Sequence, residues 1–168
     1  MQSQIKNICR SSSLALHKIS QIRKYLDRET TEQLVHAFVT CRLDCCNSLL
    51  LSLPDSQIAK LQRIQNSAAR LVTRSSLRHH ITPILRSLHW LPVSERIKFK
   101  VLLLTYKCIK GTAPLYLQEI IHTYQPPRTL SSSSASQLTL PVTRTKSYGH
   151  RSFTFSAPAL WNSLPQHI

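Results

Sequence analysis

Residues 55–74 read DSQIAKLQRIQNSAARLVTR, and they predict a helix with one apolar side and one basic side. Apolar residues recur there every three or four positions, which is the spacing of one face of an α-helix. Pro54 and Asp55 mark its beginning, because proline is tolerated in a first helical turn and aspartate caps free N–H groups. The expected inward residues are Ile58, Leu61, Ile64, Ala68, Leu71 and Val72, and the opposite side carries Lys60, Arg63, Arg70 and Arg74, called the basic stripe below.

The basic stripe has two interpretations. The polar face of an amphipathic helix is most often simply solvated. However, no acid lies between Gln57 and Arg74, so these positive side chains have no opposite charge one turn away to stabilise them. We therefore expect the stripe to contact the phosphates of RNA or DNA. In the C-terminal tail, Arg144, Lys146 and Arg151 are expected to make the same kind of contact.

Similar apolar spacing predicts that most of the chain before residue 123 is helical. In the second helix, Thr30 with Gln33 resembles a capping box. Gly111 is expected to end the helix that precedes it. The expected helices, apart from 55–74, are 3–26, 30–47, 82–88, 93–109 and 114–122, and the second of them is expected to bury Leu34, Phe38, Cys41 and Cys45.

A segment rich in serine and proline separates this helical part from a basic tail. It contains Pro126, Pro127 and the run Ser131–Ser134, and it lacks apolar periodicity, which is typical of a linker. Beyond it, alternating residues predict two short strands, and a helical turn is expected around Trp161. The expected fold class is mainly α, with a multi-helix bundle over 1–122, a linker over 123–137, and a tail over 138–168 whose short β-strands are at 137–142 and 151–155.

Composition narrows the possible functions. The 168 residues include 22 Lys and Arg but 7 Asp and Glu, which gives a formal net charge of +15. This charge favours a polyanionic partner, either nucleic acid or an anionic membrane surface, unless the chain is a basic piece of a more balanced protein. Two glycines are too few for a phosphate-binding glycine loop. The acids include no pair arranged as two-metal catalysis requires, so we expect no catalysis and no cofactor.

Neither the apolar runs nor the cysteines point to a membrane or a metal ion. The longest unbroken apolar runs, Leu49–Leu51 and Val101–Leu104, are too short to span a bilayer, and we expect no membrane partner. Five cysteines without a secretory segment predict reduced thiols and a nuclear or cytoplasmic location. Cys41, Cys45 and Cys46 lack the spacing of a zinc site, and on a helix they are expected to be buried like small apolar residues.

Residues 1–26 allow a different interpretation. They contain no acid, several serines and several basic residues, which is the composition of a mitochondrial presequence. Their apolar pattern continues into the next helix without a cleavage-like break. We interpret them as the first structural helix, and mitochondrial import of a basic protein stays as an alternative.

Six segments, taken in order, resemble a known family. They are RLDCCNSLL (42–50), LQRIQNSAARLV (61–72), SLHWLPV (87–93), YKCIKGTAPLYL (106–117), RTKSYGHRSF (144–153) and APALWNSLP (157–165). Together they resemble the C-terminal region of LINE-type (non-LTR) retrotransposon reverse transcriptases of the jockey-like group, and the resemblance covers essentially the whole chain. Cys45 stands where that family commonly has tyrosine, and Ser11–Ser13 stand where aromatic residues are usual.

The resemblance implies a thumb-like fold and a function in binding nucleic acid. In that family the helical part contacts template–primer and target DNA, while the catalytic carboxylates belong to a palm and an endonuclease placed earlier in the polyprotein. The chain would then be a non-catalytic fragment whose former partner is the palm. An inert remnant, or one that makes only protein interactions, is the alternative.

Overall fold

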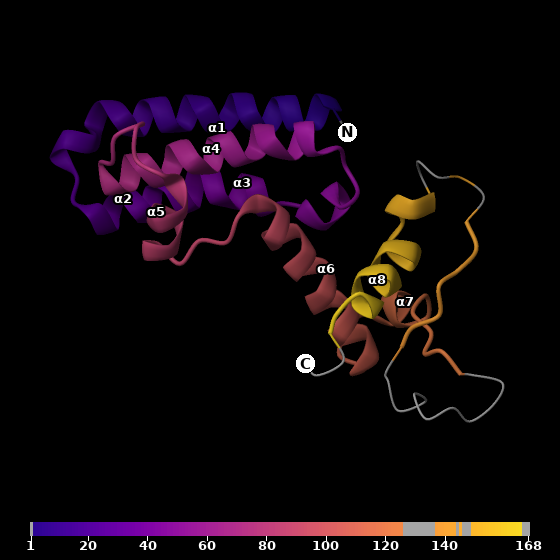
Figure 1. The fold of residues 1–168 in the computed structure, drawn as a ribbon. Coiled ribbons are helices and arrows are strands. Elements are labelled where there is room, and N and C mark those ends of the chain that lie inside the picture. The colour runs from indigo at the N-terminus through magenta and orange to yellow at the C-terminus, as the bar shows by residue number, and fades with distance from the viewer. Residues whose placement is uncertain (1, 126–136, 144, 146–148, 166–168) are drawn as a thin grey trace. The chain divides into compact units, whose positions relative to one another are not determined.

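All regular structure in the computed structural model is helical across the residues that it describes, which are 2–125, 137–143, 145 and 149–165. The expected mainly α fold class is confirmed, and no β-strand occurs in these residues (Figure 1). The chain divides into two compact units, Met1–Ile97 and Lys98–Ile168, and each is described by itself below. No helix in the described part of the chain is both long enough and apolar enough to cross a membrane.

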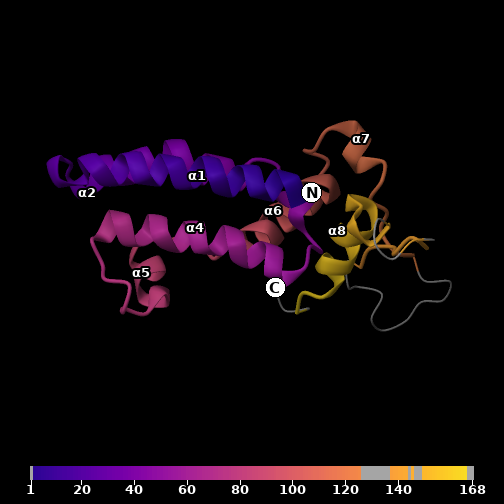
Figure 2. The ribbon, with the colours of Figure 1, turned by 90° about the horizontal axis from the view of Figure 1, so that it is seen from above.

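The first unit is built around two long helices that lie side by side, α1 and α4 (Figures 1 and 2). They run in the same direction, because the chain returns between them through α2, a π-helical turn and α3. Their N-terminal ends therefore lie at one end of the unit. The elements are α1 (Gln2–Ile22), the 3₁₀ turn η1 (Arg23–Tyr25), α2 (Arg28–Val35), the π turn η2 (His36–Thr40), α3 (Cys41–Asp44), the 3₁₀ turn η3 (Asn47–Leu50), α4 (Asp55–Thr73), α5 (Ile81–Ser87) and the first turn of α6 (Val93–Ile109).

The core of this unit follows the expected helical spacing in α1 and α4. Ile5 and Leu61 are almost fully buried, and Ala68 and Val72 continue the buried side of α4. The helix bounds of α4 and α6 agree with the sequence prediction to within one residue. Gly111, at φ 68°, ends α6 in the left-handed conformation that glycine adopts without strain.

The prediction for the second helix was wrong in its phase and in its cap. Phe38, Cys41 and Cys45 are exposed rather than buried, and only Leu34 of the expected stripe is partly buried. The sequence offers two stripes with helical spacing, the expected one at 34, 38, 41 and 45 and another at 31, 35, 39 and 43, and the second of them packs inward. The buried residues are Thr31, Val35, Val39 and Leu43.

Asp27, and not Thr30, caps this helix. The Asp27 carboxylate accepts a hydrogen bond from the Thr30 backbone N–H at 3.2 Å. The Thr31 hydroxyl donates to the Asp27 carbonyl oxygen at 2.6 Å. The helix therefore begins at Arg28, and the residue expected to be the cap instead provides the N–H that is capped.

The second unit contains the rest of α6, α7 (Leu115–Gln118), the 3₁₀ turn η4 (Gly149–Arg151) and α8 (Phe153–Asn162). The two predicted strands do not form. Residues 137–142 contribute only an isolated bridge, between Leu138 and Thr123, and residues 151–155 contain the end of η4 and the start of α8. Backbone hydrogen bonds to His122 and Tyr124 flank this bridge, and the side chain of Asn162 bonds the N–H and the carbonyl oxygen of Leu138 itself at 2.9 Å.

The helical turn expected around Trp161 is confirmed, since this residue lies in α8. The serine run of the expected linker lies outside the described residues.

Candidate nucleic-acid interface

The structure divides the basic stripe into two parts with different surroundings. Lys60 and Arg63, in the N-terminal half of α4, are exposed and line a groove. Arg70 and Arg74, at its C-terminal end, donate hydrogen bonds to backbone carbonyl oxygens. The stripe is therefore not a uniform row of free charges.

The groove lies between the N-terminal parts of α1 and α4 and has a volume of about 640 Å³. Because the two helices run in parallel, their residues 2–9 and 57–64 face each other at the same end of the unit (Figure 2). Ile5, Cys9 and Ile64 supply its apolar lining. Its positive residues are Lys6, Lys60 and Arg63, and its remaining lining residues are Gln2, Ser3 and Gln57; we call this feature the basic groove.

The charged residues that line the basic groove are all positive. None of its lining residues is an acid, and Lys60 donates a hydrogen bond to the neutral side chain of Gln57 at 3.3 Å. The first turn of α1 contains no acid and adds the partial positive charge of a helix N-terminus, whereas the carboxylate of Asp55 in the first turn of α4 offsets that helix's contribution. Burial raises the pKa of the Cys9 thiol, and the positive charge of Lys60 offsets part of that rise, so Cys9 is a neutral thiol at pH 7.

Arg70 and Arg74 each donate hydrogen bonds to backbone carbonyl oxygens of the first unit. Arg70 donates to the carbonyl oxygen of His79 at 3.3 Å, and its Nε is buried with no hydrogen-bond partner among the described residues. Arg74 donates to the carbonyl oxygens of Arg23 at 3.1 Å and Leu26 at 3.4 Å. It also ends α4 in a left-handed conformation, with φ at 54°.

Arg23 is the important basic residue that the sequence prediction missed. Its side chain is only 8% exposed and donates to the carbonyl oxygens of Leu71 at 2.9 Å, Val72 at 2.8 Å and Leu26 at 2.8 Å. It therefore satisfies carbonyl groups in the last turn of α4. Burial lowers the pKa of the Arg23 guanidinium, and repulsion from Arg74 lowers it further.

The contacts expected of the tail concern Arg144, Lys146 and Arg151. Arg144 and Lys146 lie outside the described residues. Arg151 is half-buried at the end of η4, in the second unit. The tail contacts expected from the sequence stay a prediction.

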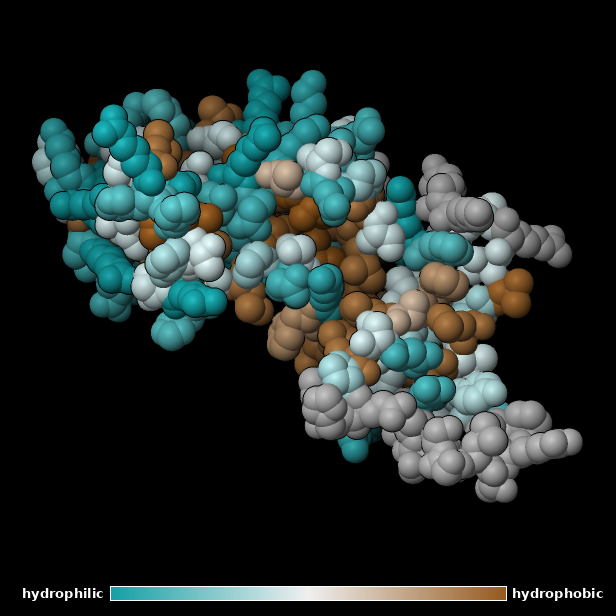
Figure 3. All heavy atoms as spheres, viewed as in Figure 1, coloured by the Kyte–Doolittle hydropathy of each residue, from teal (hydrophilic) through white to brown (hydrophobic). Residues whose placement is uncertain are grey.

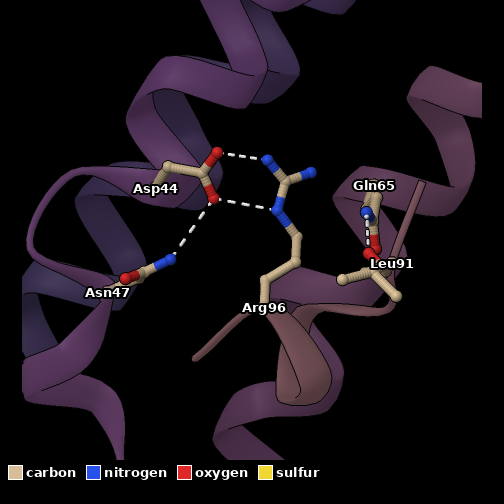
Figure 4. Close-up of polar contacts among 5 residues, drawn as sticks. All are labelled: Asp44, Asn47, Gln65, Leu91 and Arg96. Carbon is tan, nitrogen blue, oxygen red and sulfur yellow. Dashed lines mark hydrogen bonds and ion pairs between the residues drawn. The ribbon is translucent and has the colours of Figure 1, made fainter. Parts of the chain in front are cut away.

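A polar network holds the start of α6 within the first unit (Figure 4). The guanidinium of Arg96 contacts both carboxylate oxygens of Asp44, with Nε to Oδ1 at 2.9 Å. Asn47 donates to the same Asp44 carboxylate at 3.3 Å, and Gln65 donates to the Leu91 carbonyl oxygen at 2.8 Å. Arg96 is thus occupied by an internal carboxylate and is not a candidate for phosphate binding.

The described residues contain no group of three or more His, Cys, Asp or Glu side chains placed to hold a metal ion. Comparison of the chain with protein-family models, with curated proteins and with solved structures gives no match in any of the three.

Proposed function

We propose that the chain is a non-catalytic, nucleic-acid-binding fragment of a LINE-type retrotransposon RNA-directed DNA polymerase, without its palm and endonuclease. The resemblance of its six sequence segments suggests the origin. The observation that carries the binding function is the basic groove, which Lys6, Lys60 and Arg63 line together with apolar residues and which no acid lines.

The chemistry of the groove suits a phosphate backbone. Lysine and arginine neutralise phosphates and release their counterions, which supplies most of the sequence-independent affinity for nucleic acid. Phosphate contacts carry no base information, so the groove would bind RNA and DNA of any sequence. The aromatic residues that would stack on bases are absent from its lining, which agrees with backbone binding.

The test compares two triple variants with the same net charge. The variant K6Q/K60Q/R63Q removes the cations of the basic groove, whereas K18Q/R78Q/R86Q removes three exposed cations of the first unit that do not line it. Binding to labelled single-stranded RNA and duplex DNA is measured by fluorescence anisotropy. The groove variant should bind both roughly tenfold to a hundredfold more weakly, since each exposed ion contact is worth up to about 1 kcal/mol. An equal loss in both variants would show that only bulk charge matters.

The absence of catalysis is tested separately. Protein purified free of host polymerases should show no primer extension with Mg²⁺ or Mn²⁺, because phosphoryl transfer depends on carboxylates that hold these ions. Extension above a mock preparation would refute a non-catalytic fragment.

A second candidate function is protein interaction alone, and the exposed apolar residues of the second unit favour it. Phe99, Tyr106, Leu115 and Tyr116 are between 49% and 74% exposed. Phe99 and Tyr106 belong to α6. Figure 3 shows hydrophobic residues gathered along this helix. Such a surface would have met the palm in the parent polymerase, and it should cause concentration-dependent self-association in sedimentation experiments. A protein that stays monomeric at high concentration would count against this candidate.

A further inference from the structure

Three exposed cysteines lie together where α3 ends. Cys41 is the first residue of α3, Cys45 follows its last residue, and Cys46 is left-handed with φ at 53°. All three are free and exposed, contrary to the expectation that they are buried like small apolar residues. They are therefore accessible to a ligand from solvent.

Of the three, Cys45 and Cys46 form the accessible pair. The Cys41 thiol donates to the carbonyl oxygen of Ala37 at 2.6 Å, so it is tied to its own helix. The pKa of the Cys45 thiol lies above its usual value. The larger cause is the hydrogen bond between the Cys45 and Cys46 side chains, and the second is the repulsion between two neighbouring thiolates. The Cys45 thiol is consequently protonated at neutral pH.

These two thiols are poorly placed to form a disulfide with each other. Consecutive Cα atoms are about 3.8 Å apart, whereas disulfides usually join Cα atoms about 4.4 to 6.8 Å apart. An atom inserted between the two sulfurs relieves that strain, because it lengthens the ring that joins them.

We propose that Cys45 and Cys46 form a dithiol site for a soft, thiophilic centre that needs only two sulfur ligands from the protein, of the class of monosubstituted trivalent arsenicals. Soft centres prefer sulfur ligands. A zinc-like ion would need more donors than this pair provides, and no group of three or more metal-binding side chains is placed to hold an ion in the described part of the chain.

The binding step balances without an oxidant. In the reaction with an organoarsenic oxide, two S–H bonds and the arsenic–oxygen bond break, and two As–S bonds form. The two thiol protons leave with the oxygen as one water molecule, and arsenic stays trivalent. The second As–S bond closes within one molecule, so the adduct should resist competing monothiols.

The test uses phenylarsine oxide as the probe and intact mass spectrometry as the readout. The protein, kept reduced and then freed of reductant, should take up one phenylarsenic group at this pair. The adduct should withstand about 1 mM monothiol, because the effective concentration of a tethered second thiol is at least of that order. A competing dithiol, 2,3-dimercaptopropanol, should remove the adduct.

Single substitutions identify the sulfurs. C45S and C46S should each make the adduct at least about tenfold more sensitive to monothiol, since either leaves one As–S bond instead of a chelate. C41S and the distant C9S should retain the resistant adduct. A resistant adduct that persists in C46S but disappears in C41S would place the site on Cys41 and Cys45 and overturn the proposal, as would persistence in both C45S and C46S. Far-UV circular dichroism checks that each variant folds, and exposed Cys→Ser changes should leave it unchanged.

Discussion

Replacing Arg23 by methionine should destabilise the first unit by about 2 to 4 kcal/mol. The Arg23 guanidinium makes hydrogen bonds of 2.8 to 2.9 Å to three carbonyl oxygens, two of them in the last turn of α4. Each hydrogen bond from a charged group contributes about 1.5 to 3 kcal/mol, and a positive charge at a helix C-terminus adds about 0.3 to 1 kcal/mol. The expected loss is smaller than the sum because methionine retains part of the packing and water reaches the half-buried Leu26.

The assay is urea unfolding followed by tryptophan fluorescence in a W161F background. Trp90 is then the single tryptophan, and it is buried in the first unit against the ring of His36, with centroids 5.3 Å apart. It therefore reports this unit even if the second unit unfolds separately.

Two further substitutions separate hydrogen-bond geometry from charge. R28M removes a positive charge from an exposed residue that lines the same hollow as Arg23 at this end of the unit, and it should change stability by less than about 0.5 kcal/mol. R23K keeps the charge but loses the planar set of donors, so its stability should fall between those of R23M and the unsubstituted protein. Equal losses in R23M and R28M, or an R23K protein as stable as the parent, would refute the role assigned to Arg23.

Two other predictions concern hydrogen bonds in the first unit. Q62A should lower the free energy of unfolding in urea by about 1 to 3 kcal/mol, because the buried Val93 N–H loses the Gln62 side-chain oxygen, which lies 2.8 Å away. Replacing the exposed Gln4 (Q4A) should change it little, and similar losses in both variants would contradict this reasoning. The pKa of Asp27 is lowered, chiefly by its hydrogen bond from Thr30, so its charged form contributes stability that is present above its unfolded pKa and lost as pH falls through its lower folded pKa. D27N keeps a capping side chain, and the parent should therefore lose stability relative to D27N between about pH 5 and pH 2; a stability difference that does not change with pH would show that the Asp27 charge is unimportant.

The regular amphipathic helices could be predicted from the sequence, because their apolar spacing has only one good phase. In α4, the apolar residues around Leu61 and Ala68 recur every three or four positions, so they all lie on one side of the helix. The buried residues of α4 lie on that side. In the second helix, two stripes of residues with helical spacing could each face the core. Packing against α1 and α4 buries the stripe that contains Val35 and Val39.

The error in the tail and the uneven surroundings of the basic stripe both arise from tertiary contacts. Alternation at 137–142 predicted a strand, but its backbone pairing with residues 122–124 is limited to one isolated bridge, and the Asn162 side chain bonds the N–H and carbonyl oxygen of Leu138. Arg70 and Arg74 share the sequence pattern of Lys60 and Arg63, and only the fold brings carbonyl oxygens to them. The burial of Arg23 could have been predicted, because Arg23 continues the three- and four-residue spacing of the buried residues Ser12, Leu16 and Ile19 of α1.

Lys6 belongs to the candidate site because of the fold and not because of its place in the sequence. It lies far from α4 in sequence, on a different helix. The parallel course of α1 and α4 places it in one groove with Lys60 and Arg63.

The most direct test of phosphate binding by the basic groove is the salt dependence of duplex DNA affinity. The slope of log affinity against log salt concentration becomes shallower by about 0.9 for each duplex phosphate that the protein no longer neutralises. K6Q/K60Q/R63Q should therefore reduce the magnitude of this slope by about 2.7 relative to the unsubstituted protein, while K18Q/R78Q/R86Q, with the same net charge, should leave it nearly unchanged. Equal slopes for the two variants would contradict the assignment of the groove as the binding site.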